Sequence, residues 1–131
     1  MQDAVMTLSN KTEHQFRSEC SISRTLEILG DKWTLLIIRD LMWHGKHTFK
    51  DLQESAEKMP ANILANRLRR LMDWGLIRRA PYQDRPVRYS YHLTDAGMAI
   101  ETILLQVMDW GHRNLDGGKF SPKSGQSTAA K

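Results

Sequence analysis

The sequence of 131 residues contains one cysteine, Cys20, which excludes an internal disulfide and any zinc site built from several cysteines. It also contains no apolar run of about 18 residues, the length that a transmembrane helix needs. The first twenty residues are polar and in places acidic, unlike a secretory signal, so we expect a cytoplasmic protein with no membrane partner. Glycine-rich phosphate loops, HExxH motifs and nucleophile–base–acid sets are missing as well, so we expect no enzymatic activity, no cofactor and no metal site.

The composition is that of an ordinary globular domain. Hydrophobic residues make up 40% of the chain and charged residues 26%, so the sequence can bury one modest core. Residues 1–18 show no clear periodicity and are expected to form a flexible arm. Residues 116–131 are rich in glycine, serine and lysine, which predicts a disordered tail. The folded domain is therefore expected to span residues 19–115.

Positive charge is concentrated in one segment of the chain. The formal net charge of the whole chain is +4 at pH 7, whereas residues 59–93 contain seven arginines, no lysine and two aspartates, which gives +5. The arginines are Arg67, Arg69, Arg70, Arg78, Arg79, Arg85 and Arg88. Arginine presents a planar fork that suits phosphate oxygens and guanine edges. On charge alone, a solvated charged face is an equal alternative.

Four helices are predicted in the first part of the domain, over residues 21–29, 32–43, 49–57 and 60–74. Asp31 and Thr48 are the expected N-caps of the second and third helices, because their side-chain oxygens can accept free backbone N–H groups. Pro60 suits the first position of the fourth helix, where its missing N–H costs nothing. Gly30 and Gly75 suit the left-handed position that follows a helix end.

The fourth predicted helix has two contrasting faces. Leu64, Leu68 and Leu71 cluster on one side of the helix. The opposite side carries Asn62, Ala65, Asn66 and Arg69, with Arg70 at its border. Asparagine and arginine on an exposed helix can read base edges in a major groove. A short helix, a tight turn and a second helix of this kind form a helix-turn-helix pattern.

A β-hairpin is predicted after the fourth helix. Alternating apolar and polar residues predict strands over residues 76–82 and 87–93, with one buried and one solvated face, joined by a turn at 83–86. Arg85 lies in the turn and Arg88 just beyond it. A hairpin with a basic tip after a helix-turn-helix is a wing, which can reach a phosphate or enter a minor groove.

The other arginines of the segment are not all expected to contact DNA. Arg67 lies toward the apolar side of its helix, so a structural role is expected for it. Arg78 and Arg79 point to opposite faces of the first strand, so at most one of them should touch a phosphate. A winged helix that holds another protein instead of DNA is an alternative function, although such a module needs no cationic face.

A single long helix over residues 95–114, capped by Thr94, is predicted to end the domain. Its apolar stripe is wider than so small a domain can cover, which is typical of a dimer contact. The stripe contains Ile100, Ile103, Leu104, Val107 and Trp110, widened by Leu105 and Met108. The predicted fold class is α+β, mainly α: a winged helix-turn-helix with an N-terminal helix and a long C-terminal dimerisation helix.

The order and spacing of these features resemble the HxlR family of bacterial winged-helix transcriptional regulators, relatives of the MarR type. The resemblance covers about residues 20–115. Its marks are LGDKWTLLIIRDL at 29–41, NILANRLRRL at 62–71, GLIRR at 75–79 and RYSYHLTDAG at 88–97. The resemblance implies a homodimer that binds operator DNA and regulates a nearby operon, and we expect a repressor.

The resemblance also implies which residues meet DNA and which meet a second copy of the chain. The helix over about residues 60–74 is expected in the major groove, and the wing over about 82–89 on the flanking backbone or minor groove. The expected DNA contacts are Thr48, Pro60, Ala61, Asn62, Ala65, Asn66, Arg69, Arg70, Arg85 and Arg88. The expected dimer contacts are Ile22, Leu26, Ile100, Ile103, Leu104, Val107, Met108 and Trp110.

Cys20 stands just before the first helix, where the resemblance implies a frequent cysteine that several members use to sense oxidants or electrophiles. A thiol near a helix N-terminus can have a lowered pKa and react as the thiolate. The neighbouring Glu19 is negatively charged and disfavours the thiolate. Cys20 is therefore a candidate redox sensor with a small oxidant or electrophile as effector, and an inert thiol is the alternative.

Overall fold

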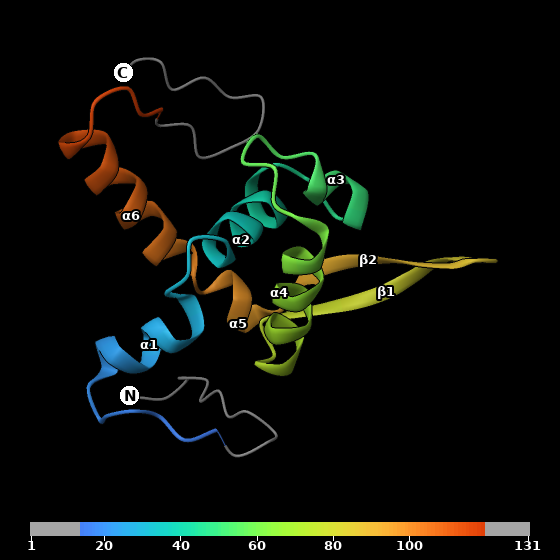
Figure 1. Ribbon diagram of the computed structural model, residues 1–131, viewed down its shortest axis with the longest axis horizontal. Helices are drawn as coiled ribbons and strands as arrows, with labels where there is room; N and C mark the ends of the chain where they lie inside the picture. The colour runs from blue at the N-terminus through green and yellow to red at the C-terminus, as the bar shows by residue number, and fades with distance from the viewer. Residues whose placement is uncertain (1–13, 120–131) are drawn as a thin grey trace.

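The computed structural model describes residues 14–119, which form six helices and a two-stranded antiparallel sheet (Figure 1). The elements are α1 (Ser21–Leu29), α2 (Thr34–Trp43), α3 (Phe49–Gln53), α4 (Ala61–Asp73), β1 (Ile77–Asp84), β2 (Val87–Leu93), α5 (Asp95–Met98) and α6 (Glu101–Asn114). The predicted fold class is confirmed. The predicted arm and tail lie largely outside the described residues. Between residues 14 and 119, no helix has the length and apolar character needed to cross a bilayer.

The hydrophobic core lies between α2, α3, α4 and the beginning of the sheet. Its most completely buried large side chains are Ile37, Ile38, Leu52, Leu64, Leu68, Leu71 and Leu76. The three leucines of α4 are spaced at i, i+4 and i+7, which places them on one side of the helix. Because this side is buried, the polar side of α4 faces outward.

Thr48 and Thr94 are N-caps as predicted, whereas the N-cap of α2 is Trp33 and Asp31 binds the turn that precedes this helix. Oγ1 of Thr48 accepts a hydrogen bond from the backbone N–H three residues further on, at 3.1 Å, and Thr94 does the same at 3.2 Å. One carboxylate oxygen of Asp31 accepts from the backbone N–H groups of Trp33 and Thr34, at 2.7 and 2.8 Å. The helix that follows Asp31 begins at Thr34, two residues later than predicted.

The connection between α3 and α4 differs from the prediction. α3 ends at Gln53 instead of residue 57, because residues 54–58 form turns from which Glu57 reaches Arg39 on α2. Pro60 has extended backbone angles (φ −60°, ψ 147°) and is the N-cap of α4, not its first helical residue. The proline ring suits this extended conformation equally well.

The prediction of one unbroken helix over residues 95–114 is wrong, since α5 and α6 are separated at residues 99–100. The backbone N–H of Ile100 donates to the carbonyl of Gly97, one residue short of the α-helical pattern. Gly97 lies so close to Leu76 that a Cβ would stand 2.1 Å from the Leu76 carbonyl oxygen. α5 is thus packed against the start of the sheet, and the chain turns before α6, whose 14 residues span about 21 Å.

The hairpin of β1 and β2 projects away from the helices (Figure 1). The strands pair as far as their last residues, so the turn is confined to Arg85 and Pro86, which are joined by a cis peptide bond. Near the helices Tyr91 is buried, whereas Val87 near the tip is 51% exposed. The predicted buried face therefore exists only at the base of the wing, because the tip extends beyond the helices.

Candidate nucleic-acid interface

The outward side of α4 forms a surface of small and polar residues. Its exposed members are Pro60, Ala61, Asn62, Ala65 and Arg69. Asn66 is half-buried, and its amide oxygen accepts a hydrogen bond from Arg67. Within residues 14–119, the side chains of Asn62 and Arg69 make no hydrogen bond or ion pair. Their donors and acceptors are therefore free to bind a ligand.

Two other arginines of α4 hold the helix in place. Nε of Arg67 lies 3.2 Å from Oδ2 of Asp31, in agreement with the structural role expected for it. Burial raises the pKa of Asp31, but hydrogen bonds from its own turn and the charge of Arg67 outweigh burial and keep the pKa below its ordinary value. Nη2 of Arg70 donates to the backbone carbonyl of Glu27 at 3.1 Å. α4 is thus tied to α1, and a DNA contact by Arg70 would compete with this hydrogen bond.

The wing adds further cations beside α4. Arg85 in the turn and Arg88 on β2 are both exposed. In the described part of the chain, the side chains of five arginines of the basic segment make neither an ion pair nor a hydrogen bond: Arg69, Arg78, Arg79, Arg85 and Arg88. Unpaired arginines of this kind leave their full charge available to an anionic partner.

Thr48 lies where the start of α3 meets the wing. It forms an isolated β-bridge with Ser90 of β2, and the backbone N–H of Tyr91 donates to the carbonyl of His47 at 2.7 Å. The Thr48 hydroxyl caps α3 and the residue is half-buried. Its contact with DNA stays a prediction.

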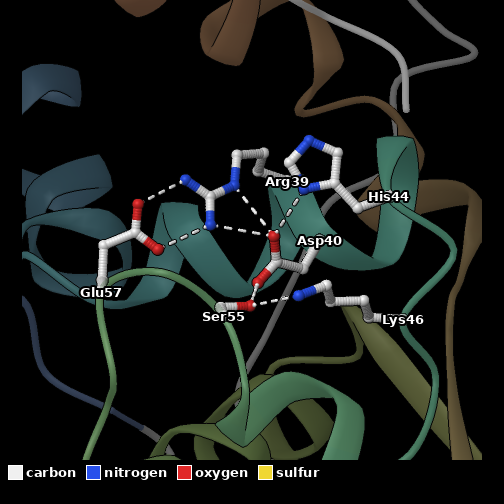
Figure 2. A network of polar contacts seen from close by, with 6 residues as sticks. All are labelled: Arg39, Asp40, His44, Lys46, Ser55 and Glu57. Carbon is white, nitrogen blue, oxygen red and sulfur yellow. Dashed lines mark hydrogen bonds and ion pairs between the residues drawn. The ribbon is translucent and has the colours of Figure 1, made fainter. Parts of the chain in front are cut away.

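A buried carboxylate fixes the loop that leads into α4 (Figure 2). Asp40 on α2 is 3% exposed, and its oxygens bind Arg39, His44 and Ser55. Arg39 also donates to both carboxylate oxygens of Glu57, each at 2.8 Å, and these hydrogen bonds lower the pKa of Glu57 to about 2. Because Ser55 and Glu57 lie in the loop before α4, this Asp40 network helps to set where that helix begins.

The Asp40 network is not among the features predicted from the sequence. A signal was present, since Asp40 follows Arg39 in a largely apolar helix and His44 follows one turn later. The partners from residues 54–58 come close only in the folded chain. The nearby His47 is not part of this network, and its ring stacks on that of His92 with 4.9 Å between ring centroids. Across residues 14–119, no group of three or more histidine, cysteine or acidic side chains is placed to hold a metal ion.

Cys20 is exposed and is the N-cap residue of α1. Its backbone carbonyl accepts a hydrogen bond from the N–H of Arg24 at 2.9 Å. On the same helix, Ile22 and Leu26 are 72% and 53% exposed. An accessible thiol therefore precedes α1, and α1 carries two exposed apolar side chains.

The predicted dimer contacts on α6 and at its N-cap fall into two groups, which differ in exposure. Ile100 and Leu104 are only 7% and 6% exposed, because they pack into the core of their own chain, and Met108 is half-buried. The exposed residues are Ile103, Val107 and Trp110. A second copy of the chain can therefore reach the outer group, while Ile100 and Leu104 serve the core of this one.

The sequence pattern of the HxlR-like helix-turn-helix family matches residues 28–119, from the end of α1 to beyond α6. The chain belongs to this family. The HxlR-type chain is 38% identical over 102 residues to an uncharacterized HTH-type transcriptional regulator of Mycobacterium tuberculosis. The aligned part covers 78% of the chain and 63% of that relative, so the chain spans less than two thirds of the relative's length.

Two solved structures have folds similar to that of the HxlR-type chain. HypR, described as a redox regulator and solved in its reduced form, has a TM-score of 0.67 and 29% identity, covering 74% of this chain and 95% of HypR. The reduced form of the transcriptional regulator YodB from Bacillus subtilis has a TM-score of 0.61 and 27% identity, covering 78% of this chain and 100% of YodB. The fold of this HxlR-type chain is thus one that transcriptional regulators use.

Proposed function

We propose that the protein is a cytoplasmic, sequence-specific transcriptional repressor that binds operator DNA and has no catalytic activity. In this proposal α4 lies in the major groove, and the wing touches the flanking backbone or minor groove. The observation that carries it is the outward face of α4, where Asn62 and Arg69 are unpaired next to the unpaired arginines of the wing. Relatives named as HTH-type transcriptional regulators support the same reading.

The proposal includes a homodimer. Exposed apolar side chains on α1 and α6 support it, since such surfaces on a small protein mark contacts with another chain. Two copies related by a twofold axis present two α4 helices to DNA, so the half-sites should lie one helical turn, about 34–36 Å, apart or a multiple of it.

Fluorescence anisotropy tests the proposed function directly. Labelled DNA from upstream of the protein's own gene is titrated at two salt concentrations, with scrambled DNA as competitor. We expect specific binding that weakens steeply with salt, because each neutralised phosphate releases counterions. No preference over scrambled DNA, at this and at neighbouring promoters, would contradict the proposal and favour a winged helix that holds another protein.

Arg85→Ala is expected to weaken binding to operator and to scrambled DNA alike, because a contact between the exposed Arg85 and a phosphate carries no sequence information. The plot of log affinity against log salt has a negative slope, and its magnitude should decrease by about 0.9 for each protomer. Arg113→Ala is the matched control, since Arg113 is paired with Asp109 on α6. Equal salt slopes for the two variants would refute the assignment of the wing tip.

The proposal extends to regulation by oxidants through Cys20. Support comes from its exposure at the start of α1 and from similarity to HypR, a protein described as a redox regulator. Diamide is expected to join the Cys20 thiols of two protomers in a disulfide, with diamide reduced to the hydrazine, and to release the operator. Cys20→Ser should keep binding in diamide. If wild type and variant respond alike, Cys20 is the inert thiol of the alternative.

A further inference from the structure

A cleft of about 460 Å³ separates α4 from the wing. Arg69 of α4 and Arg79 of β1 both line it, together with apolar side chains of the core edge. Asp73, one helical turn after Arg69, lines it as well, and within residues 14–119 it forms no ion pair with either arginine. The charge of the cleft is therefore positive.

Arg79 is held in a defined orientation inside this cleft. Its Cζ lies 4.0 Å from the centroid of the Tyr89 ring. Stacking on an aromatic ring uses the flat face of the guanidinium and leaves the N–H groups at its edge free. No carboxylate of the described chain uses these groups. Arg79 thus presents preorganised donors, which suit an anion with several oxygens.

The neighbouring Arg78 has the same charge and is equally exposed, but it lies on the other face of the sheet. Residues directly opposite in the hairpin share a face, and Arg79 pairs with Tyr91 whereas Arg78 pairs with His92. Tyr91 lines the same cleft as Arg79. Successive residues of a strand alternate between faces, so Arg78 points away from the cleft.

We propose that the cleft between α4 and the wing holds one phosphate of the DNA backbone, bound between Arg69 and Arg79. This rests on the proposed function. In this arrangement α4 occupies the major groove of the DNA and the wing reaches the flanking minor groove or backbone. The DNA backbone that separates the two grooves must then pass between α4 and the wing. The cleft lies at that position, and Arg79 becomes a DNA contact in addition to the recognition helix and the wing tip.

The first test compares Arg79→Ala with Arg78→Ala, two variants that each remove one exposed positive charge. Affinity for operator and for scrambled duplex is measured over a range of salt. We expect Arg79→Ala to lower the salt slope by about 0.9 for each protomer, whereas Arg78→Ala lowers it by less than half as much. Arg79→Lys keeps the charge without the stacked fork and should lie between wild type and Arg79→Ala.

The second test removes the phosphate charge instead. A neutral methylphosphonate replaces one phosphate at a time, at each backbone position between the bases read by α4 and the DNA contacted by the wing. At one position wild type and Arg78→Ala should lose affinity equally, while Arg79→Ala should lose clearly less, because only Arg69 still meets that phosphate. Identical slopes for Arg78→Ala and Arg79→Ala, or no such position, would overturn the proposal while leaving DNA binding intact. If wild type binds no duplex, the proposed function fails with it.

Discussion

Asp40→Ala is expected to lower the free energy of unfolding by about 3 kcal/mol. The substitution removes the carboxylate that binds Arg39, His44 and Ser55, and the buried Ser55 hydroxyl loses its acceptor. Breaking a buried ion pair by removing one partner costs roughly 3–5 kcal/mol. The lower end applies here, because Arg39 keeps its two hydrogen bonds to Glu57. Denaturant unfolding measures the change, with wild type and variant at the same protein concentration because any dimer makes the transition depend on concentration.

Asp109→Ala is the control for this measurement. It also removes a carboxylate that pairs with an arginine, Arg113, but both side chains are largely exposed on α6. Exposed pairs contribute about 0–1 kcal/mol, so the control should unfold near wild type. If Asp40→Ala and Asp109→Ala unfold at the same denaturant concentration, the Asp40 network does not stabilise the fold.

Asn62→Ala is expected to weaken operator binding by roughly 5- to 150-fold per half-site while leaving affinity for scrambled DNA unchanged. Asn62 lies in the first turn of α4, exposed and without a partner in residues 14–119. An asparagine that binds an adenine edge contributes about 1–3 kcal/mol of discrimination and nothing to the nonspecific complex. Competition binding with operator and scrambled duplexes gives both values.

Asn114→Ala serves as the matched variant for Asn62. Its side chain hydrogen-bonds to the carbonyl of Trp110 on α6, far along the chain from the recognition helix. We expect operator affinity within about twofold of wild type, as for a surface change that costs less than about 0.5 kcal/mol. An equal loss on scrambled DNA for Asn62→Ala would instead make Asn62 a phosphate contact.

Local sequence signals were sufficient where an element depends on its own residues. α1 begins and ends at the predicted residues, and the two faces of α4 follow from the spacing of its leucines. The paired strands of the wing also match their alternating pattern to within two residues. In each case the signal and the structure lie within one stretch of chain.

The errors arise where distant parts of the chain meet. The break between α5 and α6 follows from the contact of Gly97 with Leu76, and the short α3 from the pair between Glu57 and Arg39. Neither contact has a periodic signal. The same holds for the candidate nucleic-acid interface. The spacing of residues indicated the exposed face of α4, but it did not indicate that Arg79 of β1 stacks on Tyr89 of β2.

Cys20 precedes α1, and Arg70 of α4 donates a hydrogen bond to the carbonyl of Glu27 on α1, so α1 contacts both the thiol's segment and the helix proposed to read DNA. Thermodynamic linkage is reciprocal. If oxidation of Cys20 weakens operator binding by a given factor, operator DNA must oppose oxidation by the same factor. For a two-electron couple, each tenfold change corresponds to about 30 mV. The operator would then set the oxidant level at which its own repressor responds, and bound and free molecules would titrate at different potentials.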